Sequence, residues 1–336
     1  MLLPYPKRPS FTLSVVVPVY NEDEVILEFH QRVTAVLQSL QQPYTILYVD
    51  DGSDDQTVPL IQSLISDLPN HNGRGDIKLI QLSRNFGKEI ALTAGLDHAD
   101  SDATVIIDSD LQDPPELIPK LIERWLEGYD VVYATRAQRD GESRFKKLTA
   151  YLFYRLLRKI SRIDIPEDTG DFRLLGRAAL DALKRLRERN RYMKGLYAWV
   201  GFSQTSVLYN RDPRFAGTTK WNYFKLWNLA LEGITSFTTK PLKVASYIGF
   251  LTAMGAFLFG TWIILQKLLL GNPVDGYPSL MTVILFMGGI QLMTLGIIGE
   301  YLARTFSETK GRPIYIVKEL HQHEQSKSVG DYRYGT

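Results

Sequence analysis

Residues 103–112, Ala-Thr-Val-Ile-Ile-Asp-Ser-Asp-Leu-Gln, join a short apolar run to a turn that carries two carboxylates. The run 103–107 is short and rich in β-branched residues, which is typical of a buried strand. Asp108 and Asp110 follow it with one residue between them. Mg²⁺ and Mn²⁺ prefer oxygen ligands, and Mg²⁺ is usually held by one or two carboxylates while substrate phosphates supply the rest. The spacing alone leaves two interpretations open, a metal site and an ordinary acidic turn or cap.

Apolar runs of the same kind recur through the first 135 residues, and segments with helical spacing separate them. The other runs cover residues 13–19, 44–49, 77–82 and 131–134, and the helical segments begin near Glu22, Gln56, Lys88 and Pro115. This alternation predicts an α/β fold, a mostly parallel sheet covered by helices on both faces. Ligands of such sheets bind beyond the carboxyl ends of the strands. Acids stand there twice, Asp50 with Asp51 and Asp108 with Asp110.

Composition narrows the class of protein. With 336 residues, of which 45% are apolar and 23% charged, the chain has enough apolar material for one large domain or two ordinary ones, and it is not a disordered protein. Cysteine is absent, which excludes disulfides and thiolate metal sites. No Gly-x-Gly-x-x-Gly fingerprint follows the first apolar run, so a dinucleotide site is not indicated. Residues 1–11 have no apolar core of signal-peptide length, and we expect the start of the chain to stay in the cytosol.

Two long uncharged segments near the C-terminus predict transmembrane helices. Residues 244–266 and 278–299 carry no charge, and each segment exceeds the roughly 20 residues that a helix needs to cross a bilayer. We expect helices at about 244–268 and 278–302. The alternative is a buried helical hairpin in a soluble core, but two such segments in succession at the C-terminal end argue against it.

The charges that flank these segments predict the orientation. The loop 271–277 has no lysine or arginine, whereas the outer flanks are basic: Lys240, Lys243, Arg304, Lys310 and Arg312. By the positive-inside rule both termini and the N-terminal domain face the cytoplasm, and the protein is a multi-pass protein of the plasma membrane. Small residues in the two spans suit close packing, so we expect a homo-oligomer, a dimer or a tetramer.

The chain thus divides into four parts. We predict an α/β domain over residues 1–215, a juxtamembrane amphipathic segment over 216–243, the hairpin over 244–304 and a tail over 305–336. The basic segment 145–163 has helical spacing and fits either a membrane surface or a core helix with a solvated face. From Glu319 on, the residues are polar, and we expect them to be mobile.

Three ordered motifs carry a family resemblance. They are Val-Pro-Val-Tyr-Asn-Glu at 17–22, Val-Asp-Asp-Gly-Ser-Asp-Asp-Gln-Thr at 49–57 and Asp-Ser-Asp-Leu-Gln-Asp-Pro at 108–114. This set resembles the inverting family-2 glycosyltransferases, whose fold is the Rossmann-like GT-A fold. With Gly-Asp-Phe-Arg-Leu at 170–174, Gly217, Lys220 and the two spans, the chain is similar to the polyisoprenyl-phosphate glycosyltransferases over roughly residues 12–315. That group includes dolichol-phosphate mannose synthases and, as the nearest match, bacterial undecaprenyl-phosphate glucosyltransferases of the GtrB type.

The resemblance implies a site for a nucleotide sugar. Pro18, Tyr20 and Glu22 match family positions that line the nucleotide pocket, and Asp50 and Asp51 match positions near base and ribose. A carboxylate can accept hydrogen bonds from ribose hydroxyls or a uracil N–H. A turn followed by a helix cap explains the same acids, and both interpretations can hold together.

The resemblance also implies a divalent metal, Mg²⁺ or Mn²⁺. Asp108 would face the nucleotide or the metal, and Asp110 with Gln112 would bind the ion between the two phosphates. Ser109 stands where the family more often has alanine, which leaves this assignment unchanged. A metal there would neutralise the leaving diphosphate as a Lewis acid.

The implied reaction moves a single hexose, most closely glucose from UDP-glucose, to a polyisoprenyl phosphate such as undecaprenyl phosphate, with inversion at the anomeric carbon. A lipid phosphate is already anionic, so it needs cations rather than a general base. The residues assigned to the acceptor are Arg136, Arg144, Arg211, Arg214, Lys220, Asp171 and Arg173. Arg136 and Lys220 match the family best and complete a catalytic set with Asp108 and Asp110. A solvated surface charge is the alternative for each single cation, and an internal salt bridge is the alternative for Asp171 and Arg173.

Other functions remain open at this point. Similar chains use mannose, aminosugar or other donors, and motifs do not reveal the sugar. A processive polysaccharide synthase would usually show Gln-x-x-Arg-Trp, which is absent here. A membrane-anchored nucleotide-binding protein without activity would need a vestigial metal site. No nucleic-acid partner is expected.

Overall fold

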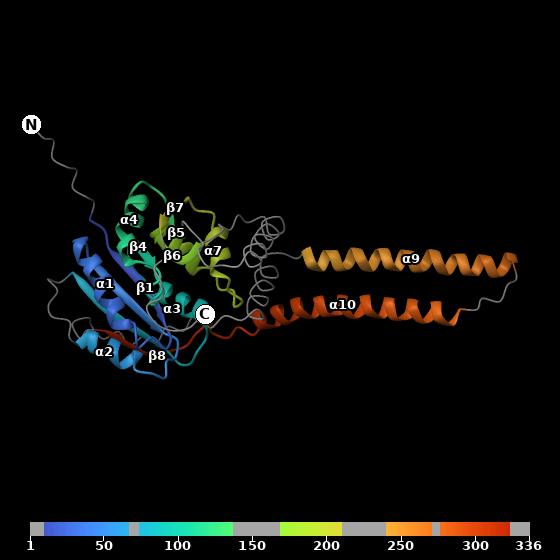
Figure 1. Cartoon of the computed structure of the whole chain (residues 1–336), viewed down its shortest axis with the longest axis horizontal. Helices are drawn as coiled ribbons and strands as arrows, with labels where there is room; N and C mark the ends of the chain where they lie inside the picture. The colour runs from blue at the N-terminus through green and yellow to red at the C-terminus, as the bar shows by residue number, and fades with distance from the viewer. Residues whose placement is uncertain (1–9, 67–73, 137–168, 210–239, 271–275, 323–336) are drawn as a thin grey trace, which may run out of the picture.

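A computed structural model of the chain describes residues 10–66, 74–136, 169–209, 240–270 and 276–322. The predicted amphipathic segment 145–163 and residues 216–239 of the predicted juxtamembrane segment 216–243 lie outside these ranges. Residues 240–243 are part of a long helix, Lys240–Leu270. The α/β part is built on one eight-stranded sheet, and two long helices extend away from it side by side (Figure 1). The α/β class and the C-terminal hairpin predicted from the sequence are therefore confirmed.

The strands form a mixed sheet with a parallel centre. They are β1 Leu13–Val19, β2 Tyr44–Asp50, β3 Gly75–Leu82, β4 Ala103–Ile106, β5 Val131–Arg136, β6 Thr169–Gly176, β7 Gln204–Tyr209 and β8 Val317–Gln322. Their spatial order is β7-β5-β6-β4-β1-β2-β3-β8. Strands β4, β1, β2 and β3 run parallel, whereas β6 is antiparallel to both β4 and β5. The four central strands match the predicted runs, but β6 separates β5 from them.

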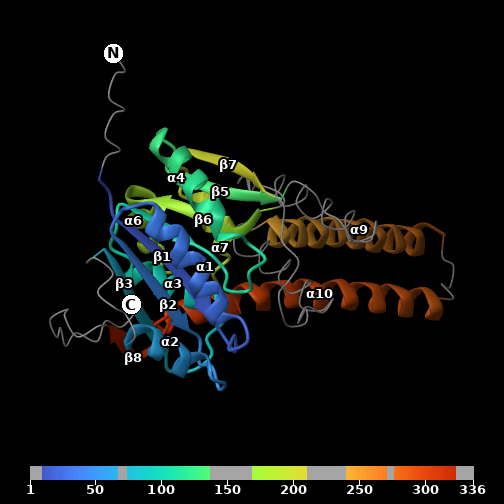
Figure 2. The ribbon, with the colours of Figure 1, turned by 60° about the vertical axis from the view of Figure 1, so that its left-hand side comes forward.

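Helices cover both faces of this sheet. They are α1 Ile26–Ser39, α2 Thr57–Ser66, α3 Lys88–His98, the 3₁₀ turn η1 Pro115–Leu117, α4 Ile118–Leu126, α6 Arg177–Lys184 and α7 Met193–Trp199. Residues of α1, α2 and α4 share one core cluster, and residues of α3, α6 and α7 share another. Figure 2 shows α1 in front of the sheet. Val15 and Val17 of β1 belong to one cluster and Val16 between them belongs to the other, so both faces of this buried strand are covered.

Helix α3 lies unusually close to the sheet because Gly95 faces it. A Cβ at Gly95 would stand 2.3 Å from Cγ1 of Val16 and 2.9 Å from Cγ2 of Val49. The absence of a side chain lets the helix contact β1 and β2 directly. This contact fixes the start of α3, at Lys88, near the carboxyl ends of the central strands.

The C-terminal end returns to the sheet. Strand β8 pairs antiparallel with β3, and the backbone N–H of Ser83 donates to the carbonyl of Ile316 over 2.9 Å. The Tyr315 side chain is 2% exposed, and its hydroxyl donates to Asp97 over 3.0 Å. The prediction of a mobile end from Glu319 on is therefore wrong for residues 319–322. Polar side chains do not prevent an edge strand, because main-chain hydrogen bonds hold it.

Two apolar helices form the hairpin. Helix α9 covers Lys240–Leu270 and α10 covers Tyr277–Thr309, and they contain candidate membrane spans at Leu242–Gln266 and Leu280–Thr309. None of the most apolar window of either helix is buried inside the protein. The Arg189 backbone N–H donates to Glu308 over 2.7 Å, which ties the end of α10 to the α/β domain. Both helices are longer than predicted and extend beyond the apolar segments.

Candidate active site

The loops after β1 and β2 are joined at the carboxyl edge of the sheet. The backbone N–H of Asn21 donates to Oγ of Ser53 over 3.0 Å, and its side-chain amide donates to Asp54 over 2.7 Å. Asn21 adopts a left-handed backbone with φ 54°, which asparagine tolerates well. Tyr20, with 39% of its surface exposed, and Glu22 stand on this joined platform, while Pro18 lies in buried β1. The three predicted nucleotide residues are thus at the edge where such sheets bind ligands.

Asp50 and Asp51 are buried and hydrogen-bonded to the backbone. The carboxylate of Asp50 accepts N–H groups of Gly52 over 3.3 Å and Ser53 over 3.1 Å. The carboxylate of Asp51 accepts those of Phe86 over 2.7 Å and Gly87 over 2.8 Å. Burial raises the pKa of Asp51, against the lowering effect of these two bonds. Both acids thus shape loops, as the turn interpretation predicts, and their role beside base and ribose stays a prediction.

Gly52 allows two of these loops to meet. Its φ is +79°, and a Cβ there would stand 2.8 Å from the carbonyl carbon of Arg84 and 2.9 Å from the nitrogen of Asn85. Only glycine fits both the backbone conformation and the close approach. The loop that it contacts leads directly into α3, so the first acid turn positions Lys88.

The acid turn after β4 meets an ammonium group. Nζ of Lys88 lies 2.7 Å from Oδ2 of Asp108 and 2.8 Å from Oδ2 of Asp171. The exposed side-chain fractions are 45% for Lys88, 27% for Asp108 and 14% for Asp171. Asp110 accepts the backbone N–H of Gln112 over 3.1 Å within the same turn. Lys88 therefore joins the predicted metal turn to the Gly-Asp-Phe-Arg motif on β6.

This ion cluster perturbs the acidity of its members. Burial raises the pKa of Asp108, although the charge of Lys88 opposes the shift. Burial acts in the same sense on Asp171, but Lys88 and Lys194 outweigh it and hold the pKa of Asp171 below its usual value. Desolvation would lower the pKa of Lys88, yet Asp108 and Asp171 together raise it well above its usual value. The ammonium is charged at neutral pH and shared by the two carboxylates.

Glu89 is a further acid of the cluster. Its Oε2 is buried with no hydrogen-bond partner among the described residues, and the nearby backbone N–H of Met193, at the start of α7, acts to lower its pKa. Burial, and then the charge of Asp171, raise the pKa of Glu89 to about 8. Sequence reasoning missed both Lys88 and Glu89. The signal in the sequence that could have revealed them is a pair of adjacent charged residues at the start of a helix that is otherwise mostly apolar.

Arg173 is an internal residue. Its side chain donates to the carbonyls of Gly170 over 2.8 Å and Asp171 over 3.3 Å, and its guanidinium lies 3.7 Å from the ring centre of Tyr197. Only 3% of Arg173 is exposed. These contacts hold Asp171 in place, and a direct role of Arg173 at the acceptor phosphate stays a prediction.

The other predicted cations are only partly placed. Arg136 ends β5, where it contacts Tyr209, and its buried Nε has no hydrogen-bond partner in the described part of the chain. Tyr209 in turn donates a hydrogen bond to Asp113, and burial raises the pKa of its hydroxyl. The remaining candidates lie outside the described residues: Arg144, Arg211, Arg214 and Lys220.

The acid turn fits a divalent metal that takes few protein ligands. Among the residues that the structure describes, no group of three or more His, Cys, Asp and Glu side chains could hold a metal by itself. Asp108 and Asp110 give the one or two carboxylates that Mg²⁺ usually takes from a protein in phosphate sites. Oδ1 of Asp108 is buried and has no hydrogen-bond partner among the described residues, so it can serve as a ligand. The predicted third ligand, Gln112, lies in the same loop.

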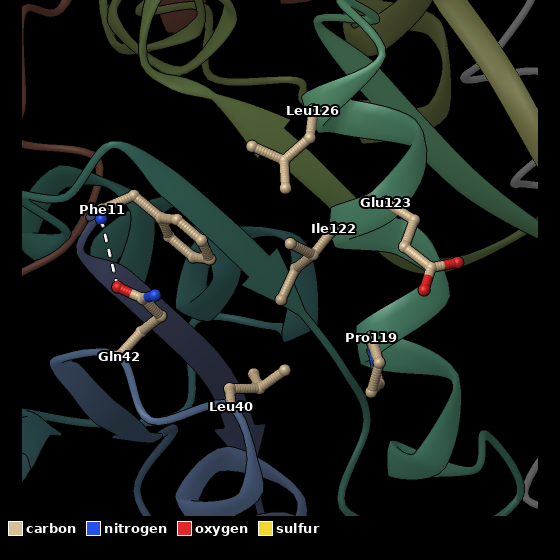
Figure 3. A pocket seen from close by; sticks show the side chains of 7 residues that line it. All are labelled: Phe11, Leu40, Gln42, Pro119, Ile122, Glu123 and Leu126. Carbon is tan, nitrogen blue, oxygen red and sulfur yellow. Dashed lines mark hydrogen bonds between the residues drawn. The ribbon is translucent and has the colours of Figure 1, made fainter. Parts of the chain in front are cut away.

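A small cavity lies elsewhere, near the amino ends of the strands. Its volume is about 50 Å³, and it lies between Phe11, just before β1, and helix α4 (Figure 3). The lining is mainly apolar, and its amide Gln42 accepts the backbone N–H of Phe11 over 3.2 Å. This cavity is too small for a sugar nucleotide and lies away from the acid turns.

Comparison with known proteins gives two family matches. The model of "Glycosyl transferase family 2" matches residues 14–184, and that of "GtrB C-terminal hairpin" matches residues 240–305. The first match contains both acid turns, the cluster around Lys88 and strand β6. The second contains nearly all of α9 and α10.

Full-length relatives are also similar. An uncharacterized glycosyltransferase of Synechocystis is 50% identical, over 93% of this chain and 96% of its own length. The SfII prophage-derived bactoprenol glucosyl transferase of Shigella flexneri is 48% identical, over 92% of this chain and 98% of its own. The prophage bactoprenol glucosyl transferase homolog of Escherichia coli is 48% identical, over 92% and 99%. The similarity therefore covers both the α/β domain and the hairpin, in the same order along the chain.

Proposed function

Because the chain belongs to glycosyltransferase family 2 and ends in a GtrB-type hairpin, we propose that it transfers one glucose from UDP-glucose to a polyisoprenyl phosphate. Undecaprenyl phosphate is the proposed lipid, since relatives 48% identical to this chain are named bactoprenol glucosyl transferases. The observation that carries the proposal is the Asp108-Ser109-Asp110 turn at the carboxyl end of β4, where Oδ1 of Asp108 has no hydrogen-bond partner in the described part of the chain. The same chain has two helices long enough to cross a membrane.

The donor would bind over the carboxyl edge of the central strands. Tyr20 and Glu22 stand on the platform that is hydrogen-bonded to the loop after β2. Asp108 and Asp110, with Gln112, would hold Mg²⁺ or Mn²⁺ beside the diphosphate. When bound, the metal neutralises charge on the leaving UDP. The platform residues and the acid turn named above would together orient the diphosphate and so keep the sugar at a fixed position.

The acceptor would react without a general base. An oxygen of the lipid phosphate forms a bond to the anomeric carbon while the bond from that carbon to the UDP oxygen breaks, so the configuration inverts. The attacking phosphate is already an anion and gives up no proton. Cations that hold it in line are Arg136 at the end of β5 and, outside the described residues, Arg144, Arg211, Arg214 and Lys220. Arginine suits this task because its guanidinium can bind two phosphate oxygens.

The membrane arrangement is part of the proposal. The lysines and arginines at the start of α9 and the end of α10 favour a cytoplasmic α/β domain and cytoplasmic termini. The hairpin would bring the lipid phosphate to the same side as the nucleotide sugar. The two helices leave most of their apolar surface exposed, as in Phe257 at 73% and Leu268 at 77%, so lipid or further copies of the chain would cover it. We propose a dimer or tetramer on this ground.

The first test is product analysis with the purified full-length protein in detergent. UDP-glucose labelled in the sugar is incubated with Mg²⁺ or Mn²⁺ and with undecaprenyl phosphate or buffer. We expect label to enter the chloroform phase only with the lipid, as one glucose per lipid. A water-soluble polymer would contradict single transfer, and greater transfer from another nucleotide sugar in a matched panel would contradict the choice of glucose.

The acceptor assignment has its own test. Lys220→Ala should raise the KM for undecaprenyl phosphate about tenfold or more and leave the KM for UDP-glucose nearly unchanged, because one phosphate contact is lost. Lys78→Ala, on β3 and paired with Asp76 at 3.7 Å, is the control for loss of a lysine. Equal changes in both KM values would reject a specific role in phosphate capture.

A further inference from the structure

Lys88 contacts one oxygen, Oδ2, of the Asp108 carboxylate, whose other oxygen, Oδ1, has no partner among the described residues and would bind the proposed metal. The Lys88 ammonium contacts Oδ2 of Asp108 at 2.7 Å and Oδ2 of Asp171 at 2.8 Å, and no other partner of Lys88 occurs among the described residues. An ammonium has three N–H donors, so one remains after these two contacts. With 45% of its side chain exposed, Lys88 stands at the surface of the site and not in the protein core.

The position of Lys88 is fixed by contacts outside the ion cluster. Asp51 accepts the N–H groups of Phe86 and Gly87 immediately before it, and Gly95 holds the same helix against β1 and β2. The ammonium is therefore presented to Asp108 by the fold. A fixed cation at this place opposes the entry of a second cation, because like charges repel most strongly where water is partly excluded.

A bound nucleoside diphosphate would offset the repulsion between the Lys88 ammonium and an entering metal ion. It brings negative charge and phosphate oxygens that complete the shell of a divalent ion. The free N–H of Lys88 could then donate to the phosphate, while Asp171 keeps the ammonium paired. Two ligands that each make the site more favourable for the other bind cooperatively, and the coupling is reciprocal.

We propose that Lys88 is a positioning residue whose positive charge opposes a divalent cation at Asp108, so that metal binds tightly only together with the nucleoside diphosphate. The inference rests on the metal site of the proposed function. The role of Lys88 would be to couple binding of the metal to binding of the nucleoside diphosphate. The metal would then not occupy the acid turn alone.

The test measures binding of Mn²⁺ to the full-length protein in detergent at slightly alkaline pH, with and without UDP. Free Mn²⁺ is read from its electron paramagnetic resonance signal, so no catalysis is needed. The wild type should bind Mn²⁺ at least about tenfold more tightly with UDP than without it. In Lys88→Met the affinity without UDP should rise by about tenfold or more, and the effect of UDP should shrink by the same factor.

Three variants separate charge from shape. Lys88→Arg keeps the cation and should behave as the wild type, whereas Lys88→Gln, neutral but polar, should behave as Lys88→Met. Lys194→Met removes a cation that acts on Asp171 and Glu89 but has no contact with Asp108. It should leave the dependence of Mn²⁺ affinity on UDP unchanged. Thermal unfolding verifies that each variant is folded, and Lys88→Gln replaces Lys88→Met if the apolar variant is not.

The outcomes distinguish the two proposals. Mn²⁺ binding that is equal with and without UDP in the wild type, or that is unchanged in both neutral variants, overturns the role of Lys88 and leaves the metal site standing. Absence of Mn²⁺ binding even with UDP overturns the metal site itself, and the inference with it. Tighter binding of Mn²⁺ alone in Lys88→Met and Lys88→Gln but not in Lys88→Arg establishes that the charge of Lys88 opposes the metal.

Discussion

The two acid turns of the sheet look alike in sequence and differ in structure. Both follow a parallel strand that neighbours β1, and both place their acids at the carboxyl edge. After β2, the carboxylates of Asp50 and Asp51 accept four backbone N–H groups between them. After β4, the carboxylate of Asp108 contacts the ammonium of Lys88 and retains one buried oxygen without a partner among the described residues.

The difference shows which acids have capacity left for a ligand. A carboxylate whose oxygens are already bonded to backbone N–H groups stabilises the loops that contain those groups. A buried oxygen without a partner costs free energy, so its persistence indicates that the site completes its bonding with something else. By this criterion we expect the first turn to build the site and the second to receive the substrate complex.

The largest expected effect comes from the second turn. Asp110→Asn should lower kcat by about 100-fold or more, because stabilisation of the leaving diphosphate by the metal is worth several kcal/mol. The midpoint of thermal unfolding should remain that of the wild type. Activity is measured by transfer of labelled glucose to lipid. Full activity of this variant in the presence of a chelator would remove the metal from the mechanism.

The same substitution in the first turn should act on stability. In Asp51→Asn one of the two N–H groups of Phe86 and Gly87 faces an amide donor, which costs about 1–3 kcal/mol. We expect a lower unfolding midpoint and a smaller loss of activity than in Asp110→Asn. UDP-dependent Mn²⁺ binding should persist. An unchanged midpoint combined with loss of Mn²⁺ binding would reverse the comparison between the turns.

The smallest expected effect is a dependence of protein stability on pH that arises from Glu89, next to the second turn. Burial and Asp171 raise the pKa of Glu89 from 4.5 to about 8, so the folded protein holds this proton more tightly than the unfolded chain. The stability from this proton is present below pH 4.5 and is lost progressively as the pH rises through about 8. Glu89→Gln stays neutral, so its unfolding midpoint should fall less across this range. Parallel profiles for the two proteins would show that Glu89 has an ordinary acidity.

Local pattern was sufficient for the elements of the fold. The five strands up to β5, the helices between them and the apolar hairpin follow from periodicity of 2 or 3.6 residues and from runs without charge. The two acid pairs were located at the right edge for the same reason, since a parallel strand fixes where its carboxyl end lies.

Strand pairing between segments that are distant in the sequence could not be predicted from local pattern. Strand β6 contains glycines and charged residues, and it enters the sheet between β4 and β5 by antiparallel pairing. Strand β8 is polar and lies more than 200 residues from its partner β3. Neither strand has the apolar pattern of a central strand. Each is held in the sheet by main-chain hydrogen bonds to its neighbouring strand, and these depend on register and not on an apolar pattern.

The sequence by itself determined the α/β class, the hairpin and the positions of the acids, because each depends on local composition and spacing. Its ordered motifs carried the resemblance to the family. Only the tertiary structure decided which acids are already bonded, which acids keep a buried oxygen without a partner among the described residues, and that Lys88 lies between Asp108 and Asp171. Those three residues come from a helix, a turn and a strand that are distant in the chain. Their meeting depends on how closely α3 packs on the sheet and on the insertion of β6, and no local pattern encodes either.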